Sequence, residues 1–171
     1  MHGRAIYEAT FKLDQGHVLE IKVKISTTIP AGKDNYLLDN MAILYLLKNY
    51  NKVKNRLLTT TNNLIILTKT IDECLVHHKK SAEKKGFQSY GYIMSHVHNF
   101  KKLLNYNCIT ILDLCDIEFE CKKNTNYDEG DLYIINALQL HDIKYLFSHD
   151  PTLKELFPKK TIEEDKILDY L

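Results

Sequence analysis

The stretch Gly130-Asp-Leu-Tyr-Ile-Ile-Asn-Ala-Leu-Gln-Leu-His-Asp-Ile-Lys-Tyr-Leu-Phe-Ser-His-Asp150 contains a predicted helix, a predicted strand and an acid at one end of each. Apolar residues recur at helical spacing from Leu132 to Leu140. Asp131 lies in the first helical turn, where a carboxylate faces the positive end of the helix dipole. Residues 144–148 are predicted to form a short buried strand, and Asp150 follows it. Because ligands bind outside the carboxyl ends of strands in open α/β sheets, this stretch predicts a site near both acids.

Short apolar runs and helical patterns alternate along the rest of the chain. Strands are predicted at residues 35–39, 64–67 and 108–112, and helices at 41–49, 52–58, 70–85, 92–104 and 151–157, followed by a charged tail. Buried strands separated by helices are typical of βαβ units and parallel sheets. The sequence therefore predicts an α/β fold with three α/β/α layers around a central, mostly parallel sheet.

The N-terminal region has a different pattern. Apolar and polar residues alternate over 4–13 and again over 19–25, on either side of Asp14-Gln-Gly-His17, which predicts an antiparallel hairpin. Residues 26–33, with Pro30 and Gly32, are predicted to be a linker, so that 1–33 form an extension to a domain over 34–171. Since an isolated hairpin is marginal in water, this one is expected to pack on the domain, on a second copy in a homo-oligomer, or on a partner.

Composition bounds the class of protein. The chain has 171 residues, of which 44% are hydrophobic and 26% charged, as in an ordinary globular domain. The net charge of +1 gives no overall basic field for nucleic acid, although local patches can still bind phosphate. No apolar run approaches the roughly 20 residues of a membrane span, and Met1-His-Gly-Arg does not begin a secretion signal. A cytoplasmic protein without a membrane partner is expected.

Four acids lie near strand ends or helix starts. Asp39 ends the first core strand and Glu73 lies on the helix after the second, and with Asp131 and Asp150 their spacings are 34, 58 and 19 residues. Carboxylates that converge raise one another's pKa unless cations lie between them. Hard oxygen ligands suit Mg²⁺ or Mn²⁺, and a pair of such ions can activate a water for attack on a phosphodiester.

The chain resembles PIN-domain nucleases, the family that includes VapC-type toxins. The resemblance covers about residues 35–157 and lies in Leu37-Leu-Asp-Asn40, Ile66-Leu-Thr-Lys-Thr-Ile-Asp-Glu73, Asp131-Leu-Tyr-Ile-Ile-Asn-Ala-Leu138 and Ser148-His-Asp150. It implies that Asp39, Glu73, Asp131 and Asp150 are catalytic and bind the metal, with Ser148 ordering the last Asp. Many members carry a small polar residue where this chain has Met41, and Asn40 is the candidate for the missing hydrogen bond.

The resemblance implies a Mg²⁺- or Mn²⁺-dependent endoribonuclease that acts on single-stranded or looped RNA. It also implies the role of a toxin with an antitoxin partner. The alternative is a PIN-like binding or scaffold module with weak or no catalysis, which Met41 and the hairpin favour. A structure-specific DNA nuclease would use the same acids, but the net charge gives it no support.

Simpler roles exist for each acid alone. Asp128 and Asp131 are both suited to capping a helix, and Asp39 to a turn at a strand end. Glu73 could be an ordinary solvated residue on the surface of its helix, as most glutamates are. Asp72 and Asp128 stand close enough in sequence to replace Glu73 and Asp131. Only the joint arrangement favours a metal site.

Histidines and lysines suggest weaker hypotheses. His77-His78 and His96-x-His98 are more typical of surface or edge histidines than of a zinc site, because i and i+2 point to different faces of a helix. The lysines at 79, 80, 84, 85, 101 and 102 are suited to an RNA backbone flanking the site, but equally to a solvated face. His149 is suited either to contact with a phosphate or to a plain loop position.

Overall fold

The centre of the molecule is a sheet of five parallel strands. The structure, a computed structural model, describes residues 6–12, 16, 18–85, 90–114 and 128–171. The strands are β3 (Asn35–Leu38), β4 (Asn63–Leu67), β5 (Ile109–Leu112), β6 (Tyr145–Phe147) and β7 (Thr161–Ile162). Their order is β5-β4-β3-β6-β7, and all neighbours pair in parallel.

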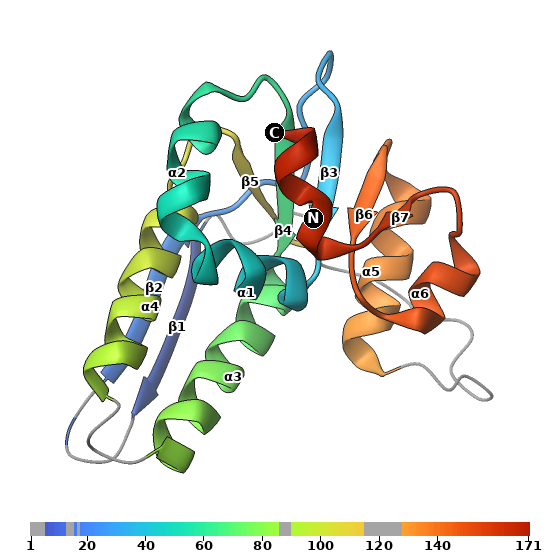
Figure 1. Ribbon diagram of the computed structural model, residues 1–171. Helices are drawn as coiled ribbons and strands as arrows, with labels where there is room; N and C mark the ends of the chain where they lie inside the picture. The colour runs from blue at the N-terminus through green and yellow to red at the C-terminus, as the bar shows by residue number, and fades with distance from the viewer. Residues whose placement is uncertain (1–5, 13–15, 17, 86–89, 115–127) are drawn as a thin grey trace.

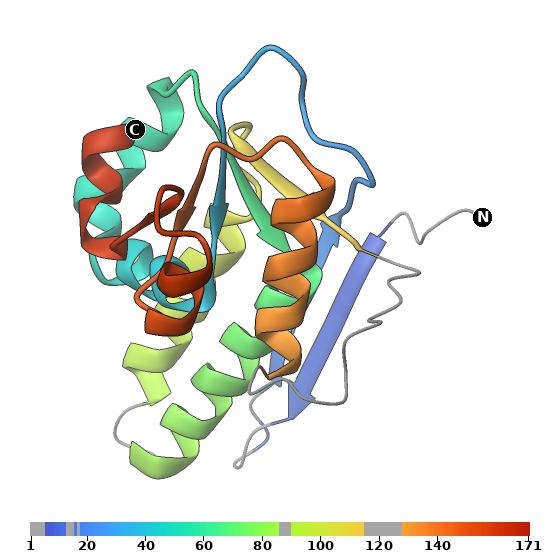
Figure 2. The same ribbon diagram turned by 90° about the vertical axis from the view of Figure 1, so that its right-hand side faces the viewer.

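Helices cover both faces of this sheet (Figures 1 and 2). They are α1 (Asn40–Lys48), α2 (Tyr50–Thr59), α3 (Thr68–Lys85), α4 (Tyr90–Leu103), α5 (Glu129–Leu140), α6 (Pro151–Leu156) and the 3₁₀ helix η3 (Glu164–Tyr170). Helices α5 and α6 lie on one face, and α1, α2, α4 and η3 on the other (Figures 1 and 2). Among the described residues, no helix has both the length and the apolar character needed to cross a membrane.

The continuous apolar runs of β3 and β4 follow from this layering. Successive side chains of a strand point to opposite faces, so both faces must be apolar where helices cover both. Leu38 and Ile66 belong to the core under α1, whereas Leu37 and Ile65 belong to the core under α5. The predicted three-layer α/β/α fold with a parallel sheet is confirmed.

Helix α5 presents a narrow buried stripe to the sheet. Ile134, Ala137 and Leu138 are buried, at the i, i+3, i+4 spacing of one helix face, while Leu140 is exposed. Asp131 is three residues before Ile134 and so lies on the side of α5 that faces the sheet.

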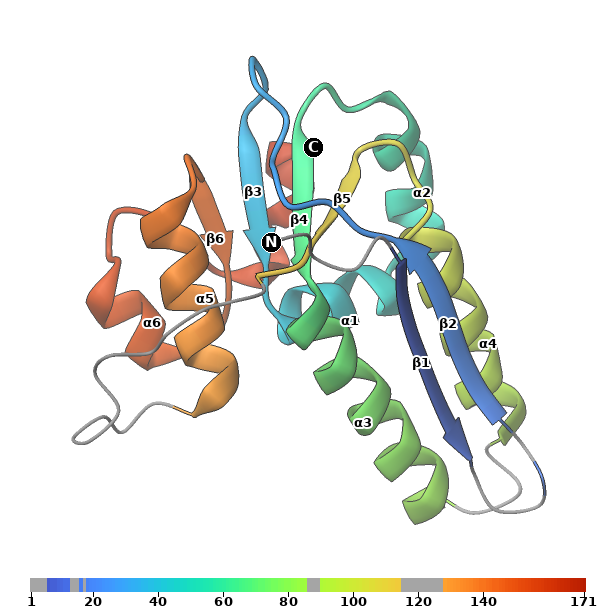
Figure 3. The same cartoon turned by 180° about the vertical axis from the view of Figure 1, so that it is seen from behind.

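The predicted antiparallel hairpin is present and packs on the chain itself. Strands β1 (Ile6–Lys12) and β2 (Val18–Lys24) pair with Tyr7 opposite Val23 and Ala9 opposite Ile21. Its apolar face lies against α3 and α4 and joins the core of the α1 side (Figure 3). The Tyr7 hydroxyl donates a hydrogen bond to Asp72 on α3. Gly16, with φ +78°, lies in the connection, whose residues 13–15 and 17 are outside the described part.

The linker after the hairpin extends the sheet at its β5 edge. The Ser26 amide donates to the Ile111 carbonyl at 2.8 Å, and the Asp113 amide donates to the Ser26 carbonyl at 3.0 Å. These two bonds pair part of an otherwise open strand edge.

The predicted charged tail is wrong, because residues after 157 form a strand and a helix of the fold. The Leu146 amide donates to the Lys160 carbonyl, and the Ser148 amide donates to the Ile162 carbonyl. Ile167 on η3 is fully buried in the core. A two-residue strand and one buried isoleucine are too short a pattern to be detected by periodicity.

We expect Ile21→Ala to lower the free energy of unfolding by about 2–5 kcal/mol, because Ile21 is buried in the core shared with the domain. The matched change Glu20→Ala, at an exposed position of the same strand, should stay within about 0.5 kcal/mol. Urea unfolding monitored by circular dichroism measures both. Equal effects would show that the hairpin does not contribute to the core.

Candidate functional site

A cavity of about 320 Å³ opens beside the carboxyl ends of the central strands. The chain order of the strands reverses between β3 and β6, and in open α/β sheets this is where ligands bind. The cavity is lined by Asp39, Asn40, Met41, Thr70, Glu73, Asp128, Gly130, Asp131, Ile134, His149, Asp150, Pro151 and Leu153. The four acids predicted as a group from the sequence therefore lie around one cavity.

Asp39 joins the end of β3 to the start of α1. Its Oδ1 accepts from the Ala42 amide at 2.9 Å and so caps the helix, and its own amide donates to the Phe147 carbonyl on β6. The side chain is nearly buried, at 7% exposure, and this desolvation raises its pKa to about 6 against the opposing hydrogen bond from Ser148. Asp39 is thus a fixed carboxylate whose charge is not fully compensated by the protein.

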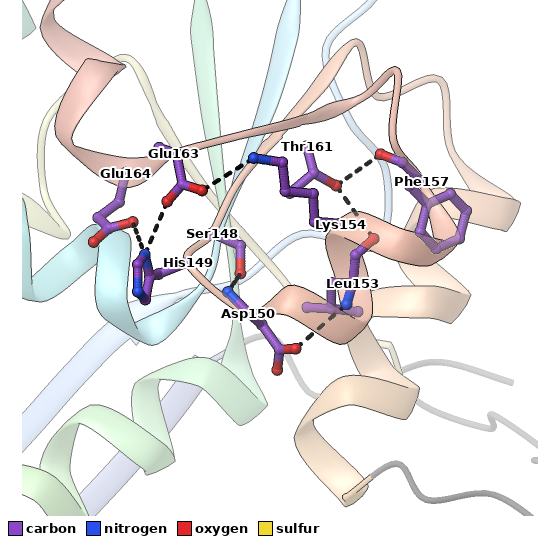
Figure 4. Close-up of polar contacts among 9 residues, drawn as sticks. All are labelled: Ser148, His149, Asp150, Leu153, Lys154, Phe157, Thr161, Glu163 and Glu164. Carbon is purple, nitrogen blue, oxygen red and sulfur yellow. Dashed lines mark hydrogen bonds and ion pairs between the residues drawn. The ribbon is translucent and has the colours of Figure 1, made fainter.

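Ser148 connects the first and the last of the four acids. Its hydroxyl lies close enough to the Asp39 carboxylate to lower that acid's pKa, and it accepts from the Asp150 amide at 3.0 Å. Asp150 in turn caps α6, because its Oδ1 accepts from the amides of Thr152 at 2.8 Å and Leu153 at 3.3 Å (Figure 4). The buried serine therefore sets the positions of Asp39 and Asp150 relative to each other.

The start of α5 contributes two acids with different tasks. Asp128 is the N-cap, and its Oδ1 accepts from the Asp131 amide at 2.8 Å. Asp131 lies in the first turn, and its pKa is raised to about 6 by burial and by the neighbouring charges of Asp128 and Asp150. Asp150 thus lies close enough to Asp131 to make the charged form of Asp131 less favourable.

Glu73 enters the cavity from the second turn of α3. Burial and the neighbouring charges of Asp128, Asp131 and Asp39 together raise its pKa to about 7, and Lys69 acts in the opposite direction. The Glu73 carboxylate lies against Gly130, where a β-carbon would overlap it. The absence of a side chain at Gly130 thus makes room for Glu73 beside Asp131.

The structure distinguishes the two alternative acids. Asp72 accepts the hydrogen bond of Tyr7 and contacts the hairpin instead of the cavity. Asp128 caps α5, as expected of it, but it also lines the cavity. Helix capping is also the local role of Asp39 and Asp150, and each cap uses Oδ1. Because a carboxylate has two oxygens, capping and ion binding are compatible.

Three further residues of the cavity bear on its chemistry. Asn40 and Met41 both line it, and Met41 is 44% exposed. Thr70, which sequence analysis missed, is buried and lies one helical turn before Glu73. The i, i+3 relation to Glu73 was the signal that places it on the same face of α3.

His149 belongs to an ion-pair cluster at the rim of the cavity. Its Nδ1 lies 2.8 Å from Glu163 and 3.7 Å from Glu164, and these acids raise its pKa (Figure 4). The ligand atoms of the three residues lie within 4.8 Å of one another, but Lys154 also pairs with Glu163 at 3.2 Å. Lys154, and His149 when it is protonated, therefore offset the charge of the two glutamates.

The sequence predicts surface or edge positions for the helical histidines, and this is wrong for His78, which is buried. His78 is 3% exposed and packs against the Phe100 ring, and burial lowers its pKa to about 4. His96 lies next to His78, with ring centroids 6.5 Å apart, whereas His98 is exposed. In the described part of the chain, these histidines do not form a group of three ligand atoms close enough to hold an ion.

Comparison with known proteins does not identify a function for this cavity. The chain matches no protein-family model, and no curated protein is similar enough to it to count as a match. The carboxylates of the cavity are therefore the feature that points to a function.

The cavity offers the oxygen donors that a hard divalent cation prefers, but among the described residues no three of its acids have ligand atoms within 4.8 Å of one another. Asp39, Glu73, Asp131 and Asp150 offer carboxylate oxygens from four different elements, and Asp128 adds a fifth acid. Such oxygen sets are preferred by Mg²⁺ and Mn²⁺. Raised pKa values at three of the acids show that the protein alone compensates their negative charge poorly.

We expect Gly130→Ala to weaken Mn²⁺ binding by about 10-fold, because the new methyl group displaces the Glu73 carboxylate. This is the size of effect that loss of a residue supporting a metal ligand typically has. Alanine favours a helix by about 1 kcal/mol over glycine, so the metal-free variant should melt no lower than wild type. Calorimetric titration and thermal unfolding give the two results. Unchanged Mn²⁺ affinity would show that Glu73 is not a ligand.

Without metal, the acids of the cavity should destabilise the fold as pH rises. The raised pKa values of Asp39, Glu73 and Asp131 mean that the folded chain keeps protons that the unfolded chain releases. Their contribution to stability is complete below about pH 4 and is lost as pH rises through about 6 to 7. Buried His78 acts in the opposite sense, because its lowered pKa favours unfolding as pH falls.

Comparison with Asp131→Asn isolates the contribution of the cavity. Between about pH 5 and 8 in EDTA, the melting temperature of the variant should fall less than that of wild type, because one acid and its repulsion are removed. Parallel curves for the two proteins would contradict the proximity of these acids.

Proposed function

We propose that the protein is a metal-dependent endoribonuclease of the PIN type. The observation that supports this is the convergence of Asp39, Glu73, Asp131 and Asp150 at the point where strand order reverses. Four acids line about 320 Å³, three of them with raised pKa values, and a modest approach of their side chains would let them hold a divalent cation. Their order and spacing along the chain match the resemblance found in the sequence.

Asp39, Glu73, Asp131 and Asp150 would hold Mg²⁺ or Mn²⁺. When bound, the metal supplies an activated water and charge stabilisation for the leaving oxygen of a phosphodiester. The chain supplies orientation: Ser148 and the Ala42 amide fix Asp39, and the first turn of α6 fixes Asp150. Glu73 and Asp131 keep raised pKa values and release their protons when the cation binds.

Single-stranded or looped RNA is the proposed substrate, because its backbone bends into an open site more readily than a duplex. A toxin controlled by an antitoxin partner is the proposed biological role, and it derives from the PIN resemblance alone. The competing proposal is a binding module with weak catalysis. Met41 favours it, because an exposed apolar side chain lies in the cavity where a polar one would assist an ion.

The decisive comparison uses two adjacent acids. Glu73→Gln should lose Mn²⁺ binding and lower RNA cleavage by more than the roughly 10–100-fold typical of outer-shell residues. Asp72→Asn should retain both, because Asp72 contacts Tyr7 and not the cavity, and should only lower stability. Calorimetric Mn²⁺ titration and cleavage of a labelled RNA in Mn²⁺ measure the effects.

Each outcome has a separate meaning. Mn²⁺ binding without cleavage in wild type would favour the binding module. Absence of Mn²⁺ binding in wild type would refute the metal site and, with it, the proposed nuclease.

A further inference from the structure

An open groove of about 590 Å³ lies between α2 and the end of α4, apart from the carboxylate cavity. The C-terminal end of α4 approaches α2 at this flank of the molecule (Figures 1 and 3). The groove is lined in part by Tyr50 and Leu58 of α2, by Lys101 and Lys102 of α4, and by Tyr106 after it. None of these residues takes part in the site described above.

The floor of the groove is aromatic and apolar. The hydroxyls of Tyr50 and Tyr106 lie 2.9 Å apart and hydrogen-bond each other across the two segments. This bond holds both rings in place between the segments. Leu58 is 71% exposed, which is unusual for a leucine within a helix and leaves an apolar surface beside the rings. The groove therefore offers a preformed surface to a flat, partly apolar group.

The rim and surroundings of the groove are basic. Residues 40–71 and 84–112 contain no Asp or Glu, although the whole chain has 22 acids and a net charge of +1. Helix α2 carries Lys52, Lys54 and Arg56, and α4 ends in Lys101 and Lys102. The carboxylate cavity, by contrast, has no Lys or Arg among its described lining residues. Lys101 and Lys102 are thus the cationic side chains that line the groove itself, and the described lining of the groove includes no acid.

We propose that this groove binds single-stranded nucleic acid, with bases stacked on the tyrosines and phosphates paired with Lys101 and Lys102. Aromatic rings beside lysines are how proteins hold unpaired strands without reading their sequence. Each nucleotide combines a planar base with a phosphate, which matches a ring platform with a basic rim. An acidic peptide offers the charge without the planar face. The groove's use in holding substrate rests on the ribonuclease function proposed above, but its binding of a strand does not.

The test measures binding of fluorescein-labelled single strands of about 12 nucleotides, as RNA and as DNA, by fluorescence anisotropy in EDTA. EDTA removes any metal-dependent cleavage, so that only binding is observed. The variants are Lys101→Glu with Lys102→Glu, and Tyr106→Leu, which keeps apolar bulk but removes the ring. The matched control is Lys12→Glu with Lys159→Glu, two exposed lysines outside the groove that give the same change in net charge.

We expect the Lys101/Lys102 double variant to bind at least about 10-fold more weakly than the control variant. Its salt dependence should be shallower by about 1.4 in log–log slope, for two lost single-strand phosphate contacts. Tyr106→Leu should weaken binding by about 5- to 100-fold with the slope unchanged, because it removes stacking and no charge. Stronger binding of RNA than of DNA would show that the groove prefers RNA. Equal binding would show that it accepts single-stranded RNA and single-stranded DNA alike.

Two results would overturn the proposal. One is equal binding by the double variant and its control. The other is an unaffected Tyr106→Leu variant together with full competition by poly-glutamate, which would identify a surface for acidic proteins. The ribonuclease proposal fails separately: an inactive wild type whose binding is lost in the double variant refutes cleavage and keeps the groove. An active wild type whose double variant binds like the control refutes only the groove.

Discussion

Electrostatic repulsion among the acids of one cavity is the constraint around which the structure is arranged. Asp39, Glu73, Asp128, Asp131 and Asp150 line about 320 Å³, and burial is the first cause of the raised pKa at three of them. Desolvated carboxylates of like charge are tolerated only with bound protons or cations. The helix starts at α1, α5 and α6 place their positive ends here and partly offset that repulsion. A divalent cation would supply the positive charge that the helix starts do not provide.

The geometry of the acids depends on one backbone junction. The Asp39 amide donates to the Phe147 carbonyl, and the hydroxyl of the next residue, Ser148, lies near the Asp39 carboxylate and accepts from the Asp150 amide. Strands β3 and β6 are neighbours in the sheet but more than 100 residues apart in the chain. Their pairing therefore fixes the separation of the first and last acids, and α3 and α5 bring the other two from the sides.

Charge is divided over the surface in a way that suits a polyanionic substrate. An acidic cavity repels a phosphate backbone until cations occupy it, so binding of the strand benefits from a basic region elsewhere. Lys101 and Lys102 at the end of α4 provide such a region, where Tyr50 and Tyr106 add aromatic surface. The net charge of +1 does not reveal that acidic and basic side chains line different cavities.

Local pattern in the sequence determined the α/β class, the hairpin and the positions of four acids at element ends, because apolar periodicity and turn chemistry act over a few residues. It left Glu73 and Asp72 as alternatives, since adjacent helical residues differ only in which way they face. Tertiary packing decided between them: the hairpin takes Asp72 through Tyr7, and the room beside Gly130 admits Glu73. Strand β7, the burial of Ile167 and the groove at α2 and α4 were likewise set by contacts between segments distant in sequence, which no local pattern encodes.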